Sequence, residues 1–114
     1  MRNWLEVDLC KLQSNVDTVR KALPEGCEFM AVVKANAYGH GEVNICRALD
    51  SMGVHRYAVA SLDEAMYIRE EGIGGDILVL SYIDPEDVAK AFAYLADADF
   101  VTGQVIPVNG GYVI

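Results

Sequence analysis

The sequence predicts a single α/β domain over residues 1–114, with three layers built around a mostly parallel sheet of about five strands. First, the spacing of hydrophobic residues alternates between two and about 3.6, which gives the order β-α-β-α-β-α-β-α-β. Second, the segments between the strands are long enough for the helices that connect parallel strands. Third, hydrophobic residues make up 53% of the chain and charged residues 23%, a composition typical of a domain with a packed core.

The first strand and the first helix are predicted near the N-terminus. Residues 4–9, "WLEVDL", alternate between hydrophobic and polar side chains, as a strand with one buried face does. A helix is predicted next, because hydrophobic residues then recur at steps of three and four: Leu9, Leu12, Val16, Val19 and Leu23. Pro24 and Gly26 are expected to end it.

The middle of the chain predicts two more strands, each followed by a helix. Residues 28–34, "EFMAVVK", form a continuous apolar run that favours a strand covered on both faces. The next helix has a stripe made of Val43, Cys46, Leu49 and Met52. Gly53 ends that helix, and residues 57–61, "YAVAS", predict the third strand. Ser61 and Glu64 then match the capping-box pattern at the start of a helix that Gly72 ends.

The last two strands and the last helix are predicted between residues 76 and 108. Residues 76–82, "DILVLSY", read as a buried strand. Asp84 and Pro85 suit the N-cap and the first position of a helix, whose stripe is Val88, Phe92 and Leu95. Residues 103–108, "GQVIPV", predict the final strand. Pro107 places it at a sheet edge, because proline cannot donate a hydrogen bond to a neighbouring strand.

Two architectures fit this order of elements. The preferred one is an open, flavodoxin- or Rossmann-like sandwich with helices on both faces of the sheet, because Pro107 suits an edge strand. The alternative is half of a (β/α)8 barrel that dimerises through its exposed sheet edges. A homodimer of this kind is the protein partner expected from the sequence.

Composition argues against several classes of function. Seventeen acidic and nine basic residues give a net charge of −8, which is unfavourable for binding nucleic acid or anionic membranes. No apolar run is long enough for a membrane span, and the N-terminus lacks the pattern of a secretion signal. The three cysteines, Cys10, Cys27 and Cys46, are far apart and odd in number, so we expect reduced thiols, no metal site and a cytoplasmic protein.

The stretch whose residues are best suited to carry out chemistry is "AVVKANAYGHG", residues 31–41. Lys34 ends a predicted strand and so lies at the edge of the sheet where ligands of parallel α/β proteins bind. A neutral lysine amine there could form a Schiff base with a carbonyl compound. The helix that follows could offer free N–H groups to a phosphate, and Tyr38 could add a hydroxyl donor. The simpler alternatives are a lysine extended into water and, for His40, an exposed loop residue.

Residues 3–82 resemble the N-terminal part of alanine racemase, a pyridoxal-phosphate enzyme with a (β/α)8 barrel. The resemblance rests on four segments in order: "WLEVDLCKLQSNV", "MAVVKANAYGHG", "YAVASLDEAMYIREEGI" and "ILVLSY". It implies that Lys34 is the Schiff-base lysine of the cofactor and that Tyr38 contacts the cofactor phosphate. The resemblance also implies that further barrel strands and a second domain would be needed to complete the catalytic site.

Residues 84–114 resemble instead the C-terminal end of short-chain dehydrogenases, through "PEDVA" and the glycine-containing "TGQVIPVNGG". The two resemblances together predict an engineered chimera, with residues 1–82 from a racemase, residues 83–114 from a dehydrogenase and the joint within 80–86. For such a chimera we expect no evolved catalytic function and no bound cofactor. The alternatives are residual pyridoxal phosphate binding through Lys34 and Tyr38, and a working racemase or small binding module.

Overall fold

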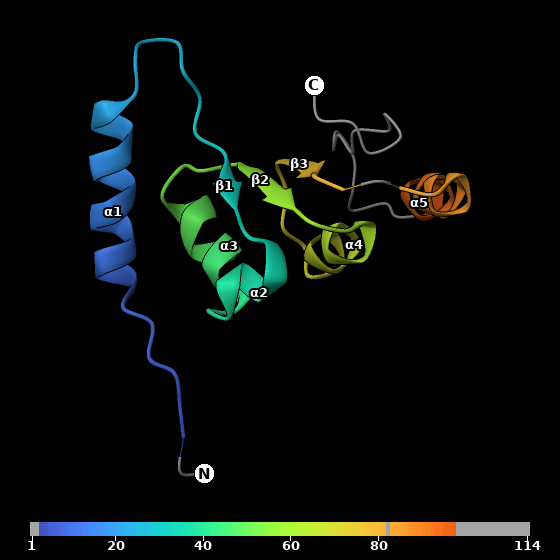
Figure 1. The fold of residues 1–114 in the computed structure, drawn as a ribbon, viewed down its shortest axis with the longest axis horizontal. Coiled ribbons are helices and arrows are strands. Elements are labelled where there is room, and N and C mark those ends of the chain that lie inside the picture. The colour runs from blue at the N-terminus through green and yellow to red at the C-terminus, as the bar shows by residue number, and fades with distance from the viewer. Residues whose placement is uncertain (1–2, 82, 98–114) are drawn as a thin grey trace.

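A computed structural model describes residues 3–81 and 83–97 of the chain (Figure 1). Within these residues an initial helix is followed by strands and helices in turn, except that two helices follow the first strand. The elements in order are α1 (Leu9–Ala22), β1 (Ala31–Val32), α2 (Lys34–Tyr38), α3 (Glu42–Ser51), β2 (Arg56–Val59), α4 (Leu62–Glu70), β3 (Asp76–Val79) and α5 (Pro85–Asp97). The α/β class predicted from the sequence is therefore confirmed for the described part of the chain.

The described sheet is parallel, and its strand order β1-β2-β3 follows the order of the chain. Right-handed crossovers between strands in this order place the connecting helices on one face. Figure 1 shows α3 and α4 together on the same side of the sheet. An open sandwich needs a reversal of strand order to cover both faces, whereas a barrel winds in sequence. The described strands thus have the winding of the half-barrel alternative, and the preferred sandwich is not supported.

The strand predicted at residues 4–9 is wrong. Residues 3–8 form neither helix nor strand, and the Trp4 side chain is 74% exposed. Alternation predicts a surface with two different faces, but a strand also needs a neighbour to bond with, and none of the described strands pairs with this segment. Asp8 instead caps α1, because its side chain accepts hydrogen bonds from the N–H groups of Cys10 and Lys11.

The remaining strands are shorter than predicted. The strand predicted at 28–34 is reduced to Ala31–Val32, although the Val33 N–H still donates to the Ala58 carbonyl at 2.9 Å. The strands predicted at 57–61 and 76–82 appear as β2 and β3, each four residues long. The strand predicted at 103–108 lies outside the described residues, so the structure describes three strands of the five expected.

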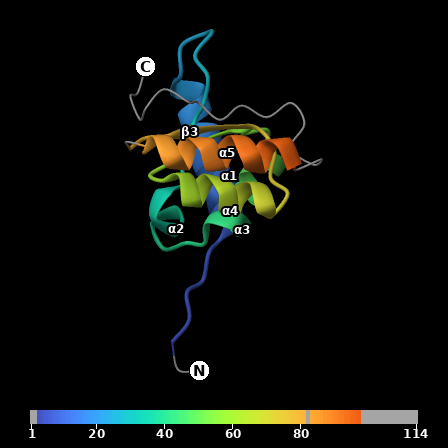
Figure 2. The ribbon, with the colours of Figure 1, turned by 90° about the vertical axis from the view of Figure 1, so that its right-hand side faces the viewer.

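The helix boundaries follow the local rules on which they were predicted. Ser61 and Glu64 form a complete capping box at the start of α4, and Pro85 is the first residue of α5. Gly53 and Gly72 follow α3 and α4 with φ of 80°, a conformation that glycine adopts without strain. Figure 2 shows α4 and α5 side by side at the end of the sheet formed by β3.

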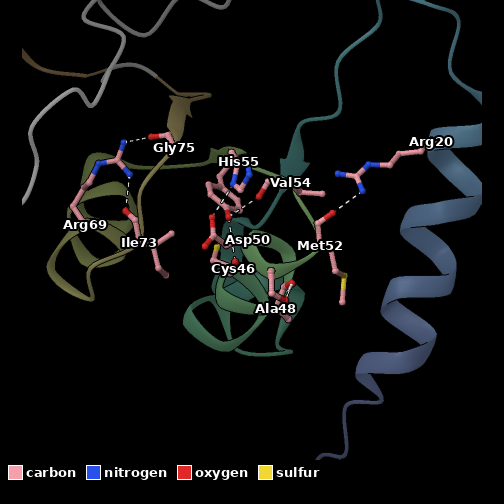
Figure 3. Close-up of polar contacts among 12 residues, drawn as sticks. Arg20, Cys46, Ala48, Asp50, Met52, Val54, His55, Arg69, Ile73 and Gly75 are labelled. Carbon is pink, nitrogen blue, oxygen red and sulfur yellow. Dashed lines mark hydrogen bonds and ion pairs between the residues drawn. The ribbon is translucent and has the colours of Figure 1, made fainter.

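The core lies between the sheet and the helices α3 and α4. Tyr57 is completely buried, and its single O–H proton is shared between two acceptors, the carbonyls of Cys46 at 3.1 Å and Val54 at 2.9 Å. Figure 3 shows the Arg69 guanidinium directed at the carbonyls of Ile73 and Gly75, which accept its hydrogen bonds. These bonds satisfy polar groups that would be costly to bury without partners. The Arg69 hydrogen bonds thus hold the turn that leads from α4 into β3.

Helix α1 lies on the side of the sheet where β1 is the edge strand (Figure 1). Val16 is its buried residue, and Arg20 donates a hydrogen bond to the Met52 carbonyl at 2.6 Å (Figure 3). A groove of about 650 Å³ runs between α1 and β1, and Met30 and Val32 are partly exposed beside it. The edge of β1 is therefore unpaired within the described residues.

All three cysteines are free thiols, as predicted, with Cys10 and Cys27 exposed and Cys46 buried. Burial, with the nearby charge of Glu42, raises the pKa of the Cys46 thiol to about 12. In residues 3–81 and 83–97, no helix combines the length and the apolar character needed to cross a membrane.

Candidate functional site

The candidate site lies where β1 and β2 end. Lys34 follows Val33 at the end of β1 and begins the short element α2, with a half-buried side chain. Tyr38 ends the same element and is 60% exposed. Within the described part of the chain, neither the Lys34 amine nor the Tyr38 hydroxyl has a hydrogen-bond or ion-pair partner. The structure therefore places the two predicted residues at the two ends of one short element, with neither polar group engaged by another described residue.

The backbone of this turn is left-handed. Ala35, Asn36 and Ala37 have φ between 53° and 56° and ψ between 43° and 49°, and Tyr38 also has a positive φ of 55°. Asparagine tolerates this region, but residues with an ordinary Cβ are strained in it by roughly 1–2 kcal/mol each. Consecutive residues of this kind persist only where surrounding interactions hold them. This turn was not predicted from the sequence.

Local hydrogen bonds stabilise the turn from within. The Ala37 N–H donates to the Val33 carbonyl at 2.9 Å, and the Asn36 carbonyl accepts from Gly41 at 2.9 Å. The Asn36 side chain adds a further bond, because its Oδ1 accepts the Glu42 N–H at 3.0 Å. These bonds connect the left-handed residues to the start of α3.

A second set of bonds reaches the turn from α4. The Glu64 carboxylate accepts the Ala35 N–H on Oε2 at 2.7 Å. Its Oε1 accepts the N–H groups of Ala60 at 2.7 Å and Ser61 at 3.1 Å. Glu64 was predicted from the sequence as a capping residue, without any link to Lys34. The nearness of Glu64 to Lys34 could have been predicted, because residues that follow neighbouring parallel strands meet at one edge of the sheet.

The predicted phosphate site at the start of α3 stays a prediction, and part of it is already occupied by groups of the protein. The N–H groups of Gly39, His40, Gly41 and Glu42 already have acceptors within the turn. The buried Glu42 side chain also occupies the first turn of α3, where it is 7% exposed. Burial, and then the charge of Glu64, raise the pKa of Glu42. A carboxyl group at this position competes with an anion for the same helix end.

His40 is exposed, as predicted, although its Nδ1 lies 2.8 Å from the Ala37 carbonyl. No group of three or more His, Cys, Asp or Glu side chains suited to a metal ion occurs in the part of the chain that the structure describes. Chemically, the site therefore offers one primary amine and one phenol at the carboxyl edge of a parallel sheet. This pair can bind a carbonyl compound covalently and donate a hydrogen bond to an anionic group on it.

Comparison with known proteins gives a consistent result. A family model described as "Alanine racemase, N-terminal domain" matches residues 7–103. The chain is 51% identical over 88 residues to alanine racemase of Geobacillus kaustophilus, which covers 77% of this chain and 23% of that protein. It is 45% identical over 91 residues to alanine racemase 1 of Bacillus subtilis, covering 80% and 23%. The chain thus spans about a quarter of the length of these curated relatives.

Solved structures agree with the sequence relatives. Alanine racemase from Bacillus anthracis with bound L-Ala-P superposes with a TM-score of 0.75 at 38% identity, covering 92% of this chain and 25% of that one. Alanine racemase from Clostridium difficile 630 gives a TM-score of 0.75 at 33% identity, covering 79% and 24%.

The comparisons contradict the prediction of an engineered chimera without evolved function. The family match crosses the expected joint at 80–86 and continues to residue 103. Identities of 40–51% to curated racemases indicate a native sequence of this kind. The dehydrogenase-like character of residues 84–114 is not supported as a separate origin. It rested on an amphipathic helix and a glycine-containing turn, which many α/β proteins share.

Proposed function

The chain belongs to the alanine racemase N-terminal domain family, because residues 7–103 match the model of that family. We propose that the chain anchors pyridoxal phosphate through Lys34. The observation that carries the proposal is the position of Lys34, directly after β1 at the carboxyl edge of a parallel sheet. The whole stretch "AVVKANAYGHG" resembles the cofactor-binding signature of the family. A racemase acting on alanine or a similar amino acid is the corresponding overall activity.

The residues present fit this cofactor. The half-buried Lys34 carries the amine that can bind the aldehyde carbon covalently, and the exposed Tyr38 carries a hydroxyl that can donate to the phosphate. When bound, pyridoxal phosphate supplies an electron sink that makes the α-proton of an amino acid acidic. The left-handed turn fixes the backbone that carries both side chains. Lys34 and Tyr38 would therefore hold the cofactor from the two ends of one short element.

Racemisation requires an acid/base group on each face of the α-carbon of the substrate. We assign one face to the Lys34 amine. Because the chain spans about a quarter of the length of its relatives, the proposal concerns this half of the chemistry and not a complete turnover.

The test is covalent trapping. The 114-residue protein is incubated with pyridoxal phosphate, reduced with borohydride and digested, and the labelled peptides are identified by mass spectrometry. We expect one major adduct, on Lys34. Lys11, Lys21 and Lys90 are the internal controls, since none of them belongs to the turn: Lys11 and Lys21 lie on α1 and Lys90 lies on α5. Lys11 is the most stringent of the three, because it lines the same groove as Ala37 and His40. Label distributed evenly over the four lysines, or total labelling unchanged in Lys34→Arg, would refute the proposal.

A further inference from the structure

We propose that Glu64 is a positioning residue for Lys34, because its carboxylate clamps the left-handed turn that immediately follows the lysine. The identity of the ligand that reacts with Lys34 rests on the proposed function above, whereas the clamp itself rests on the structure. Glu64 does not need to touch substrate or cofactor in this role. It acts through the backbone N–H of Ala35, the residue next to Lys34.

The clamp joins three segments that are separate in the sequence. Oε2 binds the Ala35 N–H at 2.7 Å, after β1. Oε1 binds the Ala60 and Ser61 N–H groups, after β2, and Glu64 itself belongs to the first turn of α4. One carboxylate therefore sets the relative position of the ends of two strands and the start of one helix. The lysine is attached at the first of these strand ends.

The bond to Ala35 exceeds what the helix requires. A capping box needs one side-chain oxygen of the third helical residue, and glutamine serves there as well as glutamate. In this protein Oε1 performs the capping role, and Oε2 is left for Ala35, 29 residues earlier in the chain. A glutamine cannot do both, because its second terminal atom is an N–H₂ group that would face the Ala35 N–H.

The turn needs support from outside. In the described part of the chain, the other hydrogen bonds made by the backbone of residues 35–38 are local ones, within 33–42. Ala35 is exposed and has φ of 53°, so packing of its own side chain does little to hold it in the left-handed region. Without the Glu64 bond, Ala35 can relax toward ordinary backbone angles. The direction in which Lys34 leaves the strand would then change with it.

The experiment compares Glu64→Gln with the wild-type 114-residue protein, and uses Ser61→Ala as the matched control. Glu64→Gln keeps the capping interaction and removes the bond to Ala35. Ser61→Ala removes the bond from the Glu64 N–H to the Ser61 hydroxyl, at 3.2 Å, and leaves the Ala35 bond in place. Both variants perturb the start of α4, but only the first perturbs the turn.

Two quantities are measured. The first is amide hydrogen exchange of Ala35, which needs no cofactor, and the second is the rate at which pyridoxal phosphate labels Lys34. For Glu64→Gln we expect the Ala35 amide to exchange faster and the Lys34 amine to be labelled more slowly. Each rate should change by roughly tenfold or more, because that is the effect of losing one hydrogen bond to a charged group. Labelling of Lys11, Lys21 and Lys90 should not change. Ser61→Ala should leave both quantities within about twofold of wild type.

Each result decides the question. The clamp is refuted if Ala35 exchanges without protection in the wild-type protein, a measurement that needs no variant to fold. It is also refuted if Glu64→Gln leaves Ala35 exchange and Lys34 labelling unchanged, or if Ser61→Ala slows labelling equally. If the wild-type protein shows a protected Ala35 but no selective Lys34 label, the proposed function fails while the clamp stands.

Discussion

The strain in the left-handed turn predicts an unusual effect of glycine. In an ordinary right-handed helix, replacing alanine with glycine destabilises a protein by about 1 kcal/mol. Ala35 is exposed and has φ of 53° and ψ of 48°, so glycine there would lose almost no packing and would relieve backbone strain. We expect Ala35→Gly to leave the free energy of unfolding unchanged or to raise it.

The change in the free energy of unfolding that we expect for Ala35→Gly is the sum of two opposing effects. Glycine in the left-handed region avoids a cost of roughly 1–2 kcal/mol that alanine incurs. The same replacement increases the entropy of the unfolded chain and costs roughly 0.5–1 kcal/mol. The net change is therefore between zero and about 1.5 kcal/mol of stabilisation. The Ala35 N–H and its bond to Glu64 are retained, so the clamp does not enter the balance.

The assay is urea denaturation of the wild type, Ala35→Gly and Ala89→Gly. Ala89 is exposed in the right-handed helix α5 and serves as the control. The unfolded-state term is common to both replacements, so the difference between the two variants should equal the strain, roughly 1–2 kcal/mol. Equal losses of stability in the two variants, with unchanged m-values, would refute the reasoning.

Two further predictions concern stability. Gly75→Ala should destabilise the fold by roughly 3 kcal/mol or more, because the new Cβ would lie 2.1 Å from the His55 carbonyl oxygen. Gly72 has a similar φ but open space around it, so Gly72→Ala should cost about 1 kcal/mol in the same denaturation assay. Equal losses of stability in the two variants would contradict the steric argument. Because its pKa is raised in the folded state, Glu42 holds its proton to higher pH than in the unfolded chain, so the stability of the wild type should fall as pH rises above the ordinary value of 4.5 and through the raised pKa. Glu42→Gln should remove this decline and raise the free energy of unfolding by roughly 1 kcal/mol near neutral pH. If the variant loses stability with rising pH in parallel with the wild type, Glu42 is not the group responsible.

Local features of the fold were predictable from the sequence because local chemistry determines them. The capping box at Ser61 and Glu64 and the proline at the start of α5 depend on a few adjacent residues, and both are confirmed. The strand at 4–9 was wrong and the sandwich is not supported, for a common reason. Alternation and the position of Pro107 describe one segment, whereas strand pairing and strand order depend on which other segments are nearby.

The site was predictable in part. The position of Lys34 followed from the rule that parallel strands present ligand-binding residues at their carboxyl ends. The left-handed turn did not follow, because Asn36 is the one residue among 35–38 whose type favours that conformation. The carboxyl group that holds the turn is also separated from it by 29 residues, so no local pattern links them.

The sequential order of the strands also has a consequence for how the domain assembles. Each described strand pairs with the strand that precedes or follows it in the chain, so no strand waits for a distant segment before it can bond. Topologies with contacts close in sequence fold faster than those that bring remote segments together. Each new strand can therefore pair with a strand that precedes it in the chain, and the sheet can grow in the order in which the chain is made.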